Sequence, residues 1–115
     1  MSTLREHLDG ILRDADEAQL ERLGRTGTSV AIRVIGKPGA GATLLLDRHP
    51  PAVTGDDEPG QVALDLTPEQ AEAYRSGRLN VPNEAFSGAI TFRGPVRLYL
   101  AVDPVLRHLL AVHGG

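Results

Sequence analysis

The sequence predicts a single α+β domain over residues 1–115, in which helices cover one face of a mixed β-sheet. Stretches whose apolar residues recur every three or four positions alternate with stretches that repeat every two, in the order helix, three strands, helix, strand, helix. The chain has 115 residues, of which 41% are hydrophobic and 23% are charged, so its size and composition are those of one soluble domain with one core.

The N-terminal segment predicts an amphipathic helix over residues 3–23. Its leucine, isoleucine and alanine positions follow a three-four spacing, and its charged residues fall mainly on the other face. Thr3 and Glu6 have the spacing of a capping box, and Gly24 stands where a left-handed residue would end the helix. Both ends of this helix are therefore indicated by local chemistry.

The next segment predicts strands. Residues 29–35 alternate between the two faces of a half-buried strand. The turn "GKPGAG" then leads into a second apolar run, "ATLLLD", and the pair predicts an antiparallel hairpin. Residues 48–60 have the proline, glycine and aspartate content of an exposed loop, and "QVALDL" restores strand character.

The stretch "TPEQAEAYRSG" predicts a short helix with clear ends. Thr67 is the expected N-cap, Pro68 occupies the first helical position, Gln70 completes a capping box and Gly77 ends the helix. The following "AITFRG" alternates as a strand does.

The C-terminal residues 95–114 fit two patterns, because residues 96–102 alternate as a strand while the whole segment also presents one helical face. A helix is favoured, since Pro95 is well placed to begin one. Proline inside a helix removes a backbone hydrogen bond, so we expect the helix to kink or break near Asp103, which could cap a restart at Pro104.

The charge and hydropathy patterns argue against several function classes. The net charge is −3, and eleven of the twelve basic residues are arginines that form no cluster, so neither nucleic acid nor an anionic membrane surface is an expected partner. No run of eighteen apolar residues and no secretion-signal pattern is present. We therefore expect a soluble, cytoplasmic protein without stable membrane insertion.

Nothing in the sequence predicts catalysis, a cofactor or a metal site. Cysteine is absent, and no two of the four histidines, His7, His49, His108 and His113, have the i,i+4 spacing of paired metal ligands. The glycines around Lys37 do not match a phosphate-binding loop, because the lysine comes first and a strand follows, so a flexible hairpin turn is the better interpretation. The chain is expected not to be an enzyme.

Residues 64–110 contain several short motifs in a defined order. A capped short helix is followed by Gly77-Arg78-Leu79, then an Ala-Phe-x-Gly turn at Ala85, Phe86 and Gly88, a short strand, Gly94 and an apolar C-terminal helix. In this order the motifs resemble the sterol carrier protein type 2 family. The resemblance implies a five-stranded, mixed or antiparallel sheet covered by helices. It also implies an apolar tunnel between sheet and helices that accepts a fatty acid, an acyl-CoA or a sterol-like molecule.

The resemblance suggests which residues line such a tunnel. All four aromatic residues lie between positions 74 and 99, and positive φ angles at Gly77 and Gly88 would bend the chain so that Phe86 points inward. The expected ligand-binding residues are Phe86, Ile90, Phe92, Leu98, Val102, Leu106 and Leu109.

Two main functions remain open, beside a third alternative in which the chain is an enzyme that uses His49 or His108 with a carboxylate. The first is a non-catalytic lipid-binding module, monomeric or homodimeric, that holds its ligand by burial alone. The second is an accessory or dimerising interaction protein that keeps the fold but fills the tunnel with its own side chains.

Overall fold

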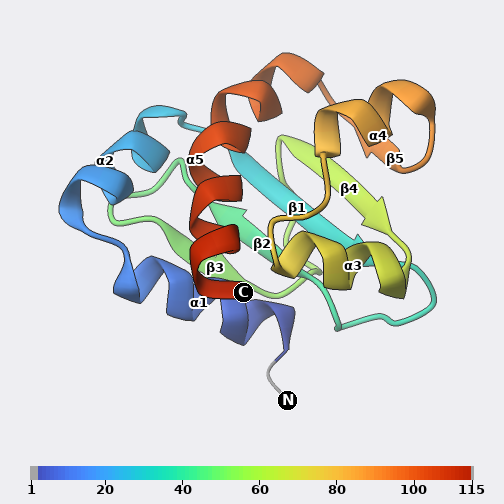
Figure 1. Ribbon diagram of the computed structural model, residues 1–115. Coiled ribbons are helices and arrows are strands. Elements are labelled where there is room, and N and C mark those ends of the chain that lie inside the picture. The colour runs from blue at the N-terminus through green and yellow to red at the C-terminus, as the bar shows by residue number, and fades with distance from the viewer. Residues whose placement is uncertain (1–2, 115) are drawn as a thin grey trace.

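The computed structural model describes residues 3–114, which form a five-stranded sheet and five helices (Figure 1). The elements in chain order are α1 (Leu4–Asp14), α2 (Glu17–Arg25), β1 (Ser29–Val34), β2 (Ala42–Leu45), β3 (Ala52–Thr54), β4 (Val62–Leu66), α3 (Pro68–Arg75), α4 (Val81–Ser87), β5 (Thr91–Arg93) and α5 (Val96–Gly114). The predicted α+β class is confirmed.

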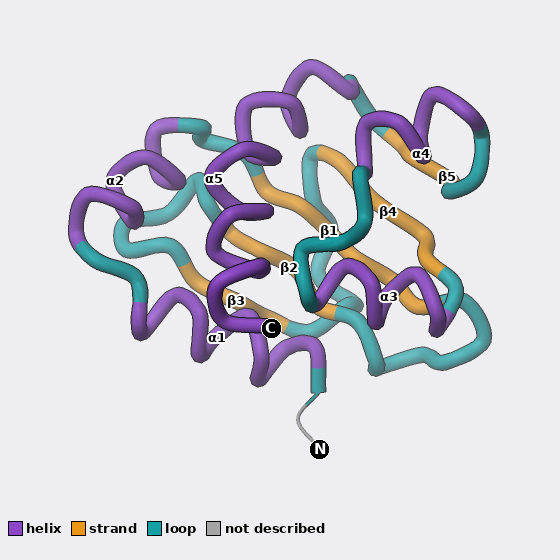
Figure 2. The backbone as a smooth tube through the Cα atoms, in the orientation of Figure 1, coloured by secondary structure: helices purple, strands orange, loops and turns teal. Residues whose placement is uncertain are grey.

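The sheet is mixed, with the strand order β3-β2-β1-β4-β5 (Figure 2). β1 and β4 run parallel at its centre, and the other three pairings are antiparallel. Parallel neighbours cannot be joined by a tight turn. The β1–β2 hairpin, β3 and the loop that follows supply the long connection from β1 to β4.

The core lies between one face of the sheet and the helices. Val30, Ile32 and Val34 of β1 and the alternate residues of β4 are buried in one cluster with apolar residues of α1, α3 and α5. The period-two pattern of residues 29–35 correctly placed Val30, Ile32 and Val34 on one face of β1. Figure 1 is viewed from this helical side.

The single helix predicted over residues 3–23 is wrong: two helices occupy this segment, and they are separated at Ala15 and Asp16. The Asp16 side chain accepts the backbone N–H of Gln19 at 2.8 Å, and the Gln19 side chain accepts the N–H of Asp16, so a second capping box starts α2. The Thr3–Glu6 box of α1 is confirmed. Gly24 lies inside α2, and the left-handed glycine after that helix is Gly27, with φ +61°.

Two short elements were not predicted. β3 lies within the segment 48–60 that was expected to be an exposed loop, where it pairs with β2 at the sheet edge. α4 lies where a turn was expected: Asn80 caps its start and Gly88, with φ +80°, ends it. Both elements are shorter than the window over which hydrophobic periodicity can be recognised.

The predicted boundaries of α3 are confirmed by its Thr67–Gln70 capping box and by Pro68 in its first turn. α5 is a helix throughout, so the strand alternative for residues 96–102 is excluded. It continues past Pro104 without a break, and Asp103 does not cap a restart. Instead Asp103 is 5% exposed and its carboxylate accepts a hydrogen bond from Arg107 Nη2 at 2.7 Å.

Candidate functional site

Six of the seven residues predicted to bind a ligand belong to the main hydrophobic core or pack against it. Ile90, Val102, Leu106 and Leu109 are buried in the core, whereas Phe92 and Leu98 are half-buried against it. The seventh prediction, that Phe86 points inward, is wrong, because its side chain is 74% exposed. The physical reason is α4, whose buried position is Val81 and whose outer surface carries Phe86.

A pair of tyrosines lies inside this apolar layer. The hydroxyls of Tyr74 (α3) and Tyr99 (α5) are 3.0 Å apart and hydrogen-bonded, and both side chains are 2% exposed. Phe92 meets Tyr99 edge to face, with ring centroids 6.1 Å apart. Burial raises the pKa of both tyrosines well above the usual value. The pair therefore stays neutral and joins α3 to α5 through the core.

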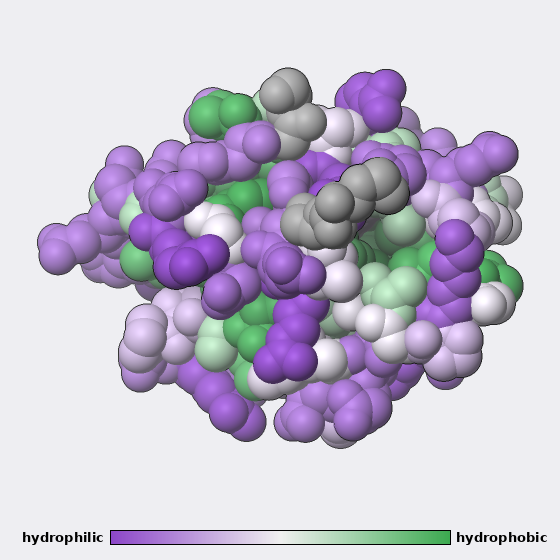
Figure 3. All heavy atoms as spheres, turned by 90° about the horizontal axis from the view of Figure 1, so that it is seen from below, coloured by the Kyte–Doolittle hydropathy of each residue, from purple (hydrophilic) through white to green (hydrophobic). Residues whose placement is uncertain are grey.

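A pocket of about 200 Å³ lies between the N-terminus of α1, α3 and the β1–β2 turn, and none of the seven residues predicted to bind a ligand lines it. We call it the α1–α3 pocket. Its lining residues are Thr3, Leu4, Val34, Lys37, Ala40, Pro68, Ala71, Glu72 and Arg75. Leu4, Val34 and Ala71 belong to the main hydrophobic core, so the pocket extends down to the core itself. Figure 3, a view from below, shows hydrophobic side chains exposed among hydrophilic ones on this face.

Capping and turn contacts hold the walls of the α1–α3 pocket. The Thr3 and Thr67 caps place the first turns of α1 and α3 on either side of it. His7 Nε2 lies 2.9 Å from the carbonyl oxygen of Arg75, which ties α1 to the end of α3. The third wall is the turn that carries Lys37. This turn is fixed because the Asp56 carboxylate accepts the N–H groups of Gly39 and Gly41, at 2.9 and 3.2 Å.

The rim of the α1–α3 pocket is polar. Lys37 is exposed and Arg75 is half-buried, and the one acidic lining residue is Glu72. The pocket therefore combines an apolar interior with a rim that carries the charged side chains of Lys37, Glu72 and Arg75.

Sequence reasoning identified buried hydrocarbon but missed this opening. Lys37 was interpreted as a residue of a flexible turn, and that interpretation holds locally, since Gly36 and Gly39 have φ +78° and +85°. The sequence pattern does not show that the β1–β2 turn, α1 and α3 lie next to one another in the folded chain. The useful signal was the position of the chain's single lysine next to the apolar end of β1.

A second pocket, of about 320 Å³, lies between α2 and α5. It is lined by Gln19, Arg22, Pro104, Val105, His108 and Leu109, so Leu109 is the one predicted ligand-binding residue at its wall. Polar side chains from α2 make up much of this lining. Its chemistry is therefore less suited to a hydrocarbon than that of the α1–α3 pocket.

Within residues 3–114, no group of three or more histidines and carboxylates is placed to hold a metal ion. Among the same residues, no helix combines the length and the hydropathy needed to span a bilayer.

Comparisons with known proteins support the fold. No family model matches the sequence, and no match was found among curated proteins. Among solved structures, the chain resembles sterol carrier protein 2 from Yarrowia lipolytica in its apo form, with a TM-score of 0.66 and 14% identity over 91% of this chain and 88% of that one.

Two further structures are similar. Sterol carrier protein domain 2 of Helicoverpa armigera gives a TM-score of 0.68 and 18% identity, over 92% of this chain and 84% of that chain. A ubiquinone synthesis protein, UbiJ-SCP2, gives 0.65 and 14%, over 91% and 86%. The chain therefore has the sterol carrier protein 2-like fold, and the resemblance predicted from residues 64–110 is confirmed at the level of fold.

Proposed function

We propose that this sterol carrier protein 2-like domain binds one lipid molecule, without chemical conversion, between its sheet and its helices. The observation that carries the proposal is the α1–α3 pocket, because its apolar lining is continuous with the main core. The hydrocarbon part of the ligand enters between α1 and α3 and extends towards α5. There Ile90, Phe92, Leu98, Val102, Leu106 and Leu109 provide the apolar surroundings.

The rim favours a fatty acid or an acyl-CoA over an uncharged lipid. Lys37 lies beside the opening, where its ammonium group attracts a carboxylate or a phosphate. A sterol-like ligand would use the apolar interior alone. Comparing an acidic lipid with a sterol therefore tests how much the rim contributes to affinity.

The small volume of the pocket fits a domain that opens on binding. Ligand sites usually measure about 300 to 1,000 Å³, whereas the α1–α3 pocket measures about 200 Å³. An empty apolar cavity costs about 24 cal/mol per Å³, so a dry tunnel of ~300 Å³ would cost on the order of 7 kcal/mol. Domain stability is only about 5 to 15 kcal/mol. A largely closed ligand-free state is therefore the stable one.

Thermal denaturation with palmitate, palmitoyl-CoA and cholesterol tests the proposal. A ligand at about 100 times its Kd should stabilise the fold by about 2.7 kcal/mol and raise Tm. Ala71→Leu puts a larger side chain into the pocket wall and should abolish most of the shift. The matched control is Ala101→Leu, at an exposed position of α5, which should leave the shift intact. The proposal fails if no ligand moves Tm, or if both variants respond like the parent protein.

Native mass spectrometry offers an independent readout. A protein that binds lipid by burial should carry a host-cell lipid through purification, and the mass of the adduct identifies the ligand class. The Ala71→Leu variant should carry less adduct than Ala101→Leu purified in parallel.

The second candidate is an accessory or dimerising protein with a filled interior. It is favoured by exposed hydrophobic side chains at Phe86, Leu100 and Val112, which are 74%, 45% and 63% exposed. Sedimentation velocity separates the two candidates, because a monomer at all concentrations that binds palmitate contradicts the dimer.

A further inference from the structure

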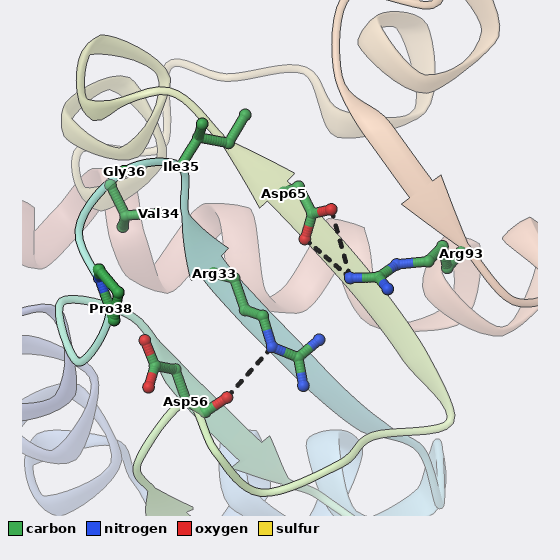
Figure 4. Close-up of a pocket in the computed structure, with 8 residues that line it drawn as sticks. All are labelled: Arg33, Val34, Ile35, Gly36, Pro38, Asp56, Asp65 and Arg93. Carbon is green, nitrogen blue, oxygen red and sulfur yellow. Dashed lines mark hydrogen bonds and ion pairs between the residues drawn. The ribbon is translucent and has the colours of Figure 1, made fainter.

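Two neighbouring pockets lie on the face of the sheet that turns away from the helices. They measure about 370 and 240 Å³, and Arg33 of β1 and Arg93 of β5 line both of them. Figure 4 shows the two arginines reaching over this face from either side of β4, which carries Asp65 between them. The loop after β3 closes one side, where Thr43 Oγ1 donates to the carbonyl oxygen of Glu58 at 2.8 Å.

Arg33 is held in place without a carboxylate partner. Its Nε donates to the backbone carbonyl oxygen of Asp56 at 3.2 Å. The Asp56 carboxylate turns away and accepts the N–H groups of Gly39 and Gly41. Within residues 3–114 Arg33 forms no ion pair, and its side chain makes no other hydrogen bond. The two terminal nitrogens of Arg33, Nη1 and Nη2, are therefore available to hydrogen-bond a ligand.

Arg93 is partly neutralised but keeps donors. Its Nη2 donates to both carboxylate oxygens of Asp65, at 3.0 and 3.2 Å. Neither Nε nor Nη1 of Arg93 has a partner among the described residues. The Asp65 contact fixes the guanidinium above β4 and leaves its remaining N–H groups for a ligand.

The smaller pocket has the composition of an anion site. It is lined by Arg33, Pro59, Gly60, Gln61, Ala63, Arg93 and Gly94, and no acidic residue is among them. Ala63 lies on β4 between the strands that carry the arginines, and its small side chain leaves room above the strand. The side-chain oxygen Oε1 of Gln61 accepts the backbone N–H of Ser29 at 3.1 Å. The side-chain nitrogen Nε2 of Gln61 therefore remains as a third donor.

We propose that this pocket binds the phosphate group of a small molecule, held between the guanidinium groups of Arg33 and Arg93. Arg33 keeps its two terminal nitrogens, and Arg93 keeps Nε and Nη1. Donors that approach from two strands suit a tetrahedral anion with several oxygens, whereas a carboxylate is satisfied by two parallel N–H groups of one arginine. The site lies across the sheet from the α1–α3 pocket, so it is independent of the proposed lipid site.

Amide chemical shifts of the full chain, titrated with inorganic phosphate at low ionic strength, test the site. Shifts should concentrate at residues 60–63 and 93–94. Arg33→Gln and Arg93→Gln should each weaken binding roughly tenfold or more, because each removes a charged donor. Arg48→Gln is the matched control, since Arg48 is exposed and lines neither pocket.

A lysine variant of Arg33 and two phosphate-containing ligands complete the test. Arg33→Lys keeps the positive charge but loses the paired N–H groups of the guanidinium. It should also weaken phosphate binding, while Tm stays near that of the parent protein. Glycerol 3-phosphate and vesicles of phosphatidic acid separate a soluble phosphate ester from a lipid headgroup, and we expect the soluble ester to bind. The proposal is overturned if phosphate produces no localised shifts, if Arg48→Gln weakens binding as much, or if the vesicles alone bind.

Discussion

At Gly77 the end of α3 meets α5 so closely that no side chain fits. A Cβ atom there would lie 2.7 Å from the backbone nitrogen of Ala111 and 2.8 Å from the carbonyl oxygen of Arg107, and φ is +74°. Gly77→Ala should therefore cost roughly 2 to 4 kcal/mol in urea denaturation. Gly88→Ala, at φ +80° with open space around it, should cost only about 1 to 2 kcal/mol. Equal losses would mean that the contact with α5 does not matter.

The two tyrosines give an optical test of core integrity, because the chain has no others. Burial raises the pKa of Tyr74 and Tyr99 above the ordinary value of 10.0. Above pH 10 the unfolded chain ionises while the folded chain does not, so this contribution to stability is lost as the pH rises. Phenolate absorbance should appear only in one cooperative step together with loss of helical circular dichroism. Gradual ionisation near pH 10 in the folded protein would contradict the buried pair.

At the scale of elements, the separation of α1 from α2 depends on Asp16. Its side chain and that of Gln19 satisfy each other's backbone N–H groups at the start of α2. Asp16→Ala should lower the free energy of unfolding by about 0.5 to 2 kcal/mol. Asp14→Ala removes a neighbouring exposed carboxylate at the C-terminal end of α1, where negative charge is unfavourable, and it should be neutral or slightly stabilising.

In α5 the pair of Asp103 and Arg107 makes stability depend on pH. Burial raises the pKa of Asp103 above 3.8, and the nearby Arg107 opposes the shift. Because the folded-state pKa is the higher one, this contribution is fully present below pH 3.8 and is lost as the pH rises through the raised value. The stability of the parent protein relative to Asp103→Asn should therefore fall as the pH increases from 3.8.

Urea titrations at several pH values measure that slope. Asp9→Asn is the control, because Asp9 pairs with Arg13 at the same i,i+4 spacing on the surface of α1, at 3.9 Å. A relative stability that rises with pH would show that the attraction of Arg107 outweighs the burial of Asp103.

For the molecule as a whole, the sequence predicted what depends on local chemistry. Alternation predicted the inward face of β1, and the capping residues of α3 predicted its boundaries. β3 and α4 were not predicted because three and seven residues are too few to show a hydrophobic period. Pairing with β2 stabilises β3, and packing beside α5 stabilises α4. The error at Phe86 follows from missing α4, since a residue expected in a turn lies on the outer surface of a helix.

The candidate site was predicted only in part for the same reason. The apolar residues of α5 could be recognised as buried from their spacing, and four predicted lining residues are in the core. The opening depends on α1, α3 and the β1–β2 turn, which are distant in sequence. Local patterns contain no information about how such segments meet.

The parallel pairing of β1 with β4 joins residues 30–34 to residues 62–66 at the centre of the sheet. During synthesis, β1 therefore leaves the ribosome well before the strand that completes its second edge. A nascent chain that stalls before residue 66 exposes one bare edge of β1 to neighbouring chains. Such truncated products should be captured by chaperones or aggregate, whereas the completed polypeptide closes that edge with its own β4.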